Sequence, residues 1–154
     1  MRGYYGAEEA TRAALQDGWL RTRDLGWIDD GGYVFLAGRQ SDLIIRGGEN
    51  IAPEEVEVVL ESHPAVEEAA VIGIPDEEWG ERVVAVVAAR PGLEVPAEEL
   101  VDYCRQRLAS YKKPEAVFFA ESLPRNALGK LLRKELREQL GTNVIGAVDG
   151  ERSG

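Results

Sequence analysis

The clearest pattern in the chain is a pair of dense apolar runs at residues 66–74 and 82–89, separated by a short polar segment. Both runs are rich in β-branched residues, which is typical of strands that pack in a sheet. A third run of this kind covers residues 116–120. Two other segments, which begin at Pro53 and Ala97, have apolar positions at helical spacing, and proline suits the first turn of a helix. The region therefore predicts strands and helices that pack together.

The residues before this region predict an arm of short elements. Helix formers fill residues 7–15, and extended segments at 19–28 and 33–38 flank the turn signal at 29–32, Asp-Asp-Gly-Gly. Residues 43–51 then predict a second hairpin whose tip carries paired glycines.

Taken in order, these elements predict an α+β fold. We expect a small, mostly three-stranded sheet covered by helices, preceded by a helix-plus-hairpin arm and a second β-hairpin. A polar interruption at residues 38–42 gives the backbone a place to pivot between the arm and the rest. Residues 141–154 are predicted to form a loose tail.

Composition limits the classes of partner. With 44% hydrophobic and 30% charged residues the chain is typical of a globular protein, and its formal net charge of -10 disfavours nucleic acids and anionic membranes. No apolar run is long enough to span a bilayer, and the first residues lack the apolar core of a secretory signal. The single cysteine excludes an internal disulfide, and no Cys and His residues have zinc-ligand spacing. We expect a cytoplasmic protein without a metal site.

The segment LPRNALGK, residues 123–130, is the candidate for chemistry. It is a loop by composition, and it precedes residues 131–140, which are almost wholly strong helix formers. Lys130 is therefore a flexible cation beside Gly129 and near a helix end, where a phosphate or carboxylate could bind. From these residues alone, a solvated surface lysine is the commoner interpretation.

Three other reactive or aromatic residues carry no assigned chemistry. His63 stands beside a proline at a helix end and is expected to cap the helix or to be solvated. Cys104 lies on the apolar face of the second predicted helix, which favours a buried, inert thiol. Trp79 either anchors its loop or faces a partner.

Five segments, in this order and spacing, resemble the C-terminal portion of the adenylate-forming superfamily, which includes acyl-CoA synthetases, aryl-CoA ligases, luciferases and peptide-synthetase adenylation domains. The segments, which lie within residues 1–140, are GWLRTRDLGWID, GRQSDLIIRGGENIAPEEVE, VIGIPDEEWGERVVAVV, YKKPEAVFF and LPRNALGKLLRKEL. Such an ordered set is far more specific than any single short motif.

The resemblance implies an ATP-dependent activation of a carboxylic acid. Family members use ATP and Mg²⁺ to form an acyl-adenylate and pyrophosphate, and the CoA ligases then transfer the acyl group to coenzyme A. Asp24 matches the acid that accepts the ribose hydroxyls of the nucleotide, and Arg39 matches a basic residue near the ribose. Lys130 matches the catalytic lysine, which bridges the carboxylate and the α-phosphate.

The resemblance also implies a second pose of the same domain. Gln40 and Ser41 match the hinge about which the small domain rotates between half-reactions. After rotation, the second hairpin lines the pantetheine tunnel, with Arg46, Gly47, Gly48 and Glu49 as the tunnel residues. At two positions the chain differs from the usual pattern: Arg23 replaces the glycine before the ribose acid and is expected to crowd the nucleotide, and Ser41 replaces the usual aspartate or lysine.

By this resemblance, residues 1–38 are the end of a large N-terminal domain, 39–41 the hinge and 42–140 the mobile C-terminal domain. Nothing in the chain resembles the phosphate loop or acyl pocket of the large AMP-binding domain. We therefore expect the chain alone to be catalytically incomplete, to hold no cofactor by itself and to need that domain in cis or in trans.

Two other functions remain as alternatives. The first is a stand-alone interaction module that kept the scaffold and lost catalysis. Such a module could also associate with itself. An adenylation domain of a peptide synthetase is the second, although the GGENI hairpin and the LPRNALGK loop favour a CoA ligase.

Overall fold

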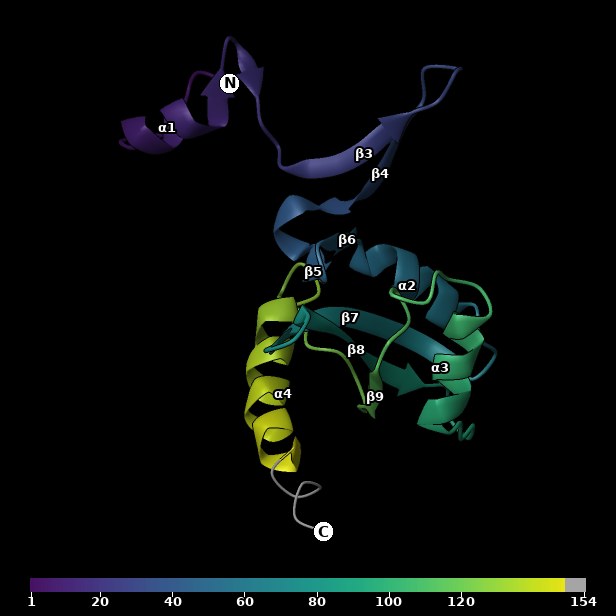
Figure 1. Cartoon of the computed structure of the whole chain (residues 1–154). Helices are drawn as coiled ribbons and strands as arrows, with labels where there is room; N and C mark the ends of the chain where they lie inside the picture. The colour runs from purple at the N-terminus through teal and green to yellow at the C-terminus, as the bar shows by residue number, and fades with distance from the viewer. Residues whose placement is uncertain (149–154) are drawn as a thin grey trace. The chain divides into compact units, whose positions relative to one another are not determined.

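The computed structural model describes residues 1–148, apart from the side chains of Ala37 and of residues 141–148. The chain divides into two units, Met1–Ser41 and Asp42–Gly154, and Figure 1 labels the larger elements of each. The predicted α+β class is confirmed.

The first unit is built from one short helix and small antiparallel ladders. Its elements are α1 (Glu8–Ala14), β1 (Leu15–Gln16), β2 (Trp19–Leu20), β3 (Asp24–Ile28) and β4 (Val34–Arg39), and the 3-10 helix η1 (Gln40–Asp42) follows. β1 pairs with β2, and β3 pairs with β4. The extended segment predicted over residues 19–28 is therefore two strands, β2 and β3, rather than one. It breaks because Arg23 takes a φ of 61°, which a continuous strand does not allow.

The β3–β4 hairpin forms at the predicted turn. The Asp29 carboxylate accepts hydrogen bonds from the N–H groups of Gly31 and Tyr33, each at 2.9 Å. Trp27 stacks on Phe35 across the ladder, with ring centroids 5.3 Å apart. None of the described side chains of this unit is buried, so cross-strand pairs are its main internal packing.

The second unit is organised on one five-stranded sheet. Its strands are β5 (Ile44–Arg46), β6 (Glu49–Ile51), β7 (Val66–Asp76), β8 (Gly80–Ala89) and β9 (Ala116–Phe119). β7 and β8 form a long antiparallel hairpin, and β9 runs parallel to β8 on its other side. The predicted second hairpin is confirmed: β5 pairs with β6, and the pair Arg46 and Gly80 joins this hairpin to β8, so the sheet has five strands.

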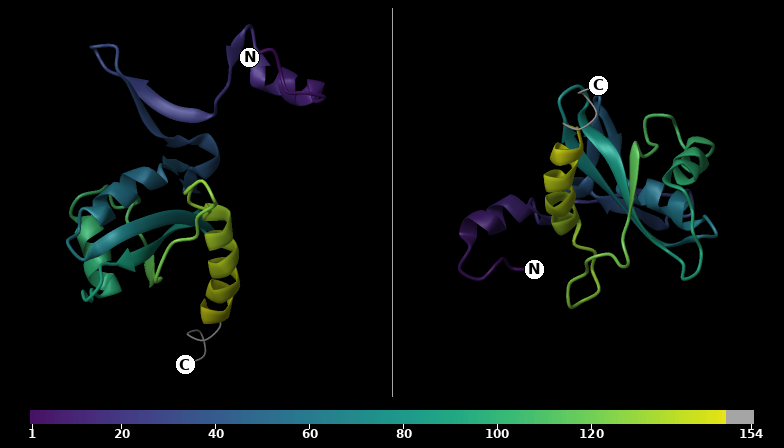
Figure 2. Two further views of the ribbon diagram at one scale, coloured as in Figure 1. Left: turned by 180° about the vertical axis from the view of Figure 1, so that it is seen from behind. Right: turned by 90° about the horizontal axis from the view of Figure 1, so that it is seen from below.

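Helices cover both faces of this sheet, as the two views in Figure 2 show. α2 (Pro53–Glu61) and α3 (Ala97–Arg105) pack on one face, and α4 (Arg133–Val148) packs on the other. Alternate residues of β8 enter separate cores: Val83 and Val87 pack with Leu60 of α2, whereas Val84 packs with Leu136 of α4. Burial on both faces explains why the sequence of β8 is almost continuously apolar.

The last helix differs from its prediction at both ends. It begins at Arg133 rather than at residue 131, and it continues to Val148. Residues 141–148 are therefore helical and not a loose tail, and the remaining predicted tail, 149–154, lies outside the described residues. Within the described chain, no helix is both long and apolar enough to cross a membrane.

Candidate functional site

Lys130 lies in a closed turn between β9 and α4. The Asn126 side-chain oxygen accepts the N–H groups of Leu128 and Lys130, at 3.0 and 2.9 Å, and the Lys130 carbonyl accepts the Asn126 N–H at 2.9 Å. Gly129 has a φ of 78°, a conformation that glycine adopts at little cost. These hydrogen bonds organise the backbone of the predicted loop.

Arg125 ties this turn to the sheet. Its guanidinium donates to the carbonyl of Gly129 at 2.7 Å and pairs with Glu68 of β7 at 2.9 Å. The side chain of Lys130 is exposed, and no hydrogen bond or ion pair of its amine occurs within the described part of the chain. The turn thus presents a free cation from an ordered backbone.

A buried ion pair holds the helix that follows the turn. Arg133, the first residue of α4, contacts both carboxylate oxygens of Glu57 on α2, at 2.7 and 2.8 Å. Glu57 also accepts the N–H of Val71 on β7 at 2.7 Å. Burial raises the pKa of the Glu57 carboxyl, although Arg133 and the Val71 N–H act in the opposite direction.

The predicted tunnel hairpin has a tight turn at its tip. Gly47 and Gly48 have φ values of 57° and 86°, the two positive angles that a type I′ turn requires, between the paired residues Arg46 and Glu49. The Gly47 N–H donates to the carbonyl of Trp79 at 2.8 Å, and a Cβ at position 47 would lie 3.1 Å from the indole. Trp79 therefore anchors this tip while remaining 46% exposed.

The β7–β8 turn that carries Trp79 is itself organised by Asp76. Its carboxylate accepts the N–H groups of Glu78 and Trp79, at 3.0 and 2.9 Å. The hydrogen bond from the Trp79 N–H lowers the pKa of Asp76, since it stabilises the ionised form.

Arg46 is engaged inside the second unit. Its guanidinium pairs with Glu115, donates to the Tyr111 carbonyl at 3.3 Å and lies 5.7 Å from the centroid of the Trp79 ring. The side chain is only 15% exposed, and it connects the hairpin to Glu115, the residue before β9. Gly48, in contrast, has open space where a side chain would stand.

The predicted nucleotide residues face each other across the β3–β4 ladder. Asp24 pairs with Arg39 in register, and the Arg39 Nε lies 3.2 Å from a carboxylate oxygen of Asp24. Both side chains are partly exposed, so the carboxylate remains accessible to a diol. Arg23 precedes Asp24 in the left-handed region, which explains why glycine suits this position.

The predicted hinge residues lie in η1, where the chain divides into its two units. The N–H of Gln40 donates to the carbonyl of Arg23 at 2.9 Å, which closes the end of the β3–β4 ladder. Asp24, Arg39, Gln40 and Ser41 fall at or before the boundary, whereas Lys130 and the tunnel hairpin belong to the second unit.

Residues 55–130 match the sequence profile of the AMP-binding enzyme C-terminal domain. The chain carries this domain. It is 53% identical over 139 residues to the 2-succinylbenzoate--CoA ligase of Bacillus cytotoxicus, and 49% identical over 144 residues to the long-chain-fatty-acid--CoA ligase FadD13 of Mycobacterium tuberculosis. These alignments cover 90% and 94% of the chain but 28% of each relative.

Solved structures give the same family. ATP-bound MatB from Rhodopseudomonas palustris is 39% identical and matches 91% of the chain with a TM-score of 0.87. The o-succinylbenzoate CoA synthetase MenE from Bacillus subtilis, in complex with the acyl-adenylate OSB-AMP, is 50% identical and matches 89% of the chain with a TM-score of 0.83. Each match covers 28% of the solved chain. The resemblance to adenylate-forming enzymes is therefore confirmed.

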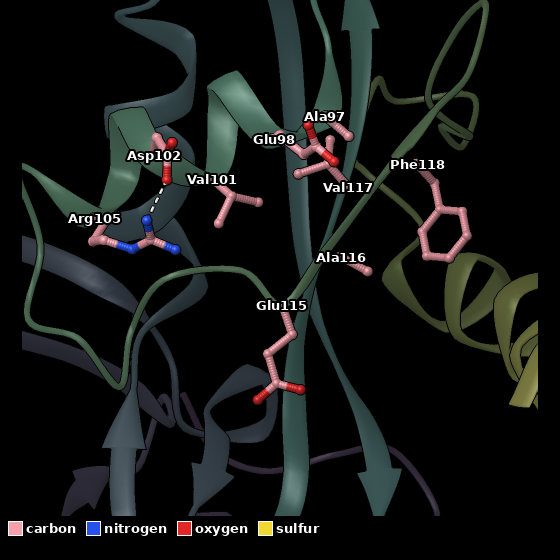
Figure 3. Close-up of a pocket in the computed structure, with 9 residues that line it drawn as sticks. All are labelled: Ala97, Glu98, Val101, Asp102, Arg105, Glu115, Ala116, Val117 and Phe118. Carbon is pink, nitrogen blue, oxygen red and sulfur yellow. Dashed lines mark hydrogen bonds and ion pairs between the residues drawn. The ribbon is translucent and has the colours of Figure 1, made fainter. Parts of the chain in front are cut away.

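The AMP-binding C-terminal domain also has a surface groove of about 550 Å³, between α3 and β9. Figure 3 shows Val101 and Val117 beside it, together with the ion pair between Asp102 and Arg105. It contains none of the predicted site residues. Among the described residues, no group of three or more His, Cys, Asp or Glu side chains could hold a metal ion.

The structure also shows the surroundings of Cys104 and His63, to which the sequence assigned no chemistry. Cys104 is fully buried, and desolvation raises the pKa of its thiol to about 11, as expected for an inert residue. His63 is buried rather than solvated, contacts Glu99 at 3.3 Å and accepts the N–H of Ala65 through Nδ1. It stabilises the loop after α2.

Sequence reasoning missed the residues that support the AMP-binding domain's lysine loop: Asn126, Arg125, Glu68, Glu57 and Arg133. One signal was present. Glu57 follows Val56 and precedes Leu60 on the buried face of α2, and a carboxylate on an apolar face requires a partner. Periodicity does not say that the partner lies 76 residues away.

Proposed function

We propose that this chain is the C-terminal part of an ATP-dependent acid–CoA ligase and that Lys130 is its adenylation lysine. The observation that carries the proposal is the exposed amine of Lys130, which stands without a partner in the described chain on a hydrogen-bonded turn. The homology to CoA ligases supports it. A cation held in this way stabilises the charge that develops as pyrophosphate leaves.

Asp24 and Arg39 are the proposed nucleotide contacts. ATP supplies the adenylyl group, and MatB and MenE have been solved with ATP and with an acyl-adenylate respectively. The exposed carboxylate of Asp24 fits a vicinal diol, which would share the carboxylate with Arg39. Mg²⁺ is assigned to the nucleotide phosphates and to ligands of the large domain, because Mg²⁺ at nucleotide sites is usually held by phosphates and one or two carboxylates.

The hairpin of Arg46, Gly47, Gly48 and Glu49 is proposed to line the pantetheine tunnel for coenzyme A after rotation about Gln40 and Ser41. The open space at Gly48 supports close approach of a ligand to the backbone. The contacts of Arg46 favour a supporting role for this residue within the hairpin.

The missing partner is an N-terminal AMP-binding domain, in cis or in trans. The chain spans 28% of its curated relatives, and we assign the acyl pocket to the remaining length. The relatives are named for 2-succinylbenzoate and for long-chain fatty acids, so an organic carboxylic acid is the proposed substrate class. We assign the enzyme to the cytoplasm.

The test compares the chain alone with the chain joined to the large domain. We expect the chain alone to release no pyrophosphate from ATP, Mg²⁺, CoA and a panel of acids. In the joined enzyme, Lys130→Ala should lower the adenylation rate by a factor of about a hundred to a thousand. Lys134→Ala is the matched control, because Lys134 is exposed on α4 and pairs only weakly with Glu138 at 3.6 Å.

Either of two results would overturn the proposal. One is steady turnover by the chain without a large domain. The other is an adenylation rate that Lys130→Ala lowers no more than Lys134→Ala does.

A further inference from the structure

The ion pair of Glu57 and Arg133 joins helices on opposite faces of the sheet. α2 packs on one face and α4 on the other (Figures 1 and 2). Because β7 is at the edge of the sheet, the ion pair passes around this edge. The Glu57 carboxylate binds the Val71 N–H of β7 and the Arg133 guanidinium at the same time. The Glu57 carboxylate thus connects α2, β7 and the start of α4, and Glu54 of α2 adds a longer contact with Arg133 at 3.4 Å.

Arg133 is also close to Lys130 along the chain, and the intervening residues are held. The Leu132 N–H donates to the Pro124 carbonyl at 2.8 Å, and Leu131 forms an isolated bridge with Arg125. These bonds close the turn that contains Lys130 at both of its ends. A shift of the first turn of α4 would therefore be transmitted to Lys130.

We infer that Glu57 is a positioning residue for Lys130, acting through Arg133 to fix where the turn presents the amine. The effect on catalysis rests on the proposed function of Lys130. The effect of Glu57 on the position of the turn can be tested in this chain by itself. Glu57 touches neither Lys130 nor a reacting atom in this arrangement. Its effect comes from the fixed contact between one guanidinium nitrogen and two carboxylate oxygens.

The alternative is that the pair only stabilises the fold. Apolar replacements of a buried ion pair are often neutral, so stability alone does not require charges at these positions. A positioning role predicts faster local opening of the turn that contains Lys130. A general stabilising role predicts faster opening throughout the second unit.

Amide hydrogen exchange on the full chain separates the two roles. We expect Glu57→Gln to speed exchange of the Lys130 and Leu132 amides by about tenfold or more, and to leave the β8 amides within about twofold of wild type. Glu55→Gln is the matched control, because Glu55 is also on α2 but pairs with Lys112 at 2.6 Å. It should leave the Lys130 amide unchanged.

Arg133→Lys provides a milder variant if Glu57→Gln does not fold. It keeps the charge but loses the planar guanidinium, so it should speed exchange at Lys130 less than Arg133→Ala does. Unchanged exchange at Lys130 in the folded variants, or equal acceleration at Lys130 and throughout β8, overturns the inference.

A kinetic arm uses the complete ligase, with this chain joined to its large domain. Glu57→Gln should lower kcat for acyl-adenylate formation about ten- to hundredfold with an unchanged KM for ATP, because small misplacements of a reacting group are costly. Thioester formation from a supplied acyl-adenylate should be unchanged. Equal losses in both half-reactions contradict positioning. If Lys130→Ala has no effect, the proposed function fails, while the exchange experiment still decides the role of Glu57.

Discussion

The two units of the chain contain different predicted site residues, and they differ greatly in how many of their side chains are buried. The second unit has a core on each face of its sheet, with fully buried residues such as Leu60 and Ile72. The first unit has no buried side chain among those described. Lys130 and the predicted tunnel hairpin therefore belong to a unit with its own core, whereas Asp24 and Arg39 belong to a two-stranded hairpin, which is marginally stable by itself.

The hairpin of the first unit exposes apolar side chains on both sides of its ladder: Trp27, Ile28, Tyr33, Val34, Phe35 and Leu36. A solvated hairpin has no physical reason for so many large apolar residues. The difference between the units indicates that packing within the second unit forms the turn of Lys130, while the hairpin of Asp24 and Arg39 leaves apolar surface that additional protein could cover. The length that the relatives have beyond this chain is consistent with that.

The largest expected contrast comes from core deletions. Leu60→Ala removes a fully buried side chain and should lower the free energy of unfolding of the second unit by about 2–5 kcal/mol. Phe35→Ala, at a side chain that is 43% exposed, should change it by less than about 0.5 kcal/mol. Urea unfolding followed by far-UV circular dichroism measures both. A comparable loss in the two variants would show that the units share one core.

A smaller effect is expected at the Cys104 thiol, which reports the integrity of the second unit. With its pKa raised to about 11, the thiol should be alkylated at pH 8 on the order of a hundredfold more slowly than in the unfolded chain. Because the folded pKa is the higher one, this group's contribution to stability is present below pH 9 and is lost as the pH rises through about 11. Rapid labelling under native conditions would contradict a closed core.

The smallest expected effect concerns the first unit. Arg23→Gly relieves a left-handed φ of 61° and should stabilise the β3–β4 hairpin by about 1 kcal/mol. Arg21→Gly is the matched control and should give no gain, since Arg21 has no positive φ. Amide exchange of Gln40, whose N–H bonds to the Arg23 carbonyl, measures the effect. Faster exchange in Arg23→Gly would show that the arginine side chain contributes contacts that outweigh the strain.

Much of the second unit was predictable because its elements depend on local pattern. The apolar runs placed β7, β8 and β9, Pro53 placed the start of α2, and the paired glycines placed the hairpin tip. The break at Arg23 was not predictable, because an arginine gives no signal for a positive φ. Nor was the end of α4, since residues 141–148 include glycines that usually end helices.

The sequence by itself determined the element types of the second unit, the family, and the position of Lys130 in a loop before a helix. These depend on residue spacing and on turn chemistry, which neighbouring residues specify. Only the tertiary structure decided that Arg46 pairs with Glu115 and that Glu57 holds Arg133 around the edge of β7. Such contacts join residues far apart in the chain, and they exist only once both faces of the sheet are covered.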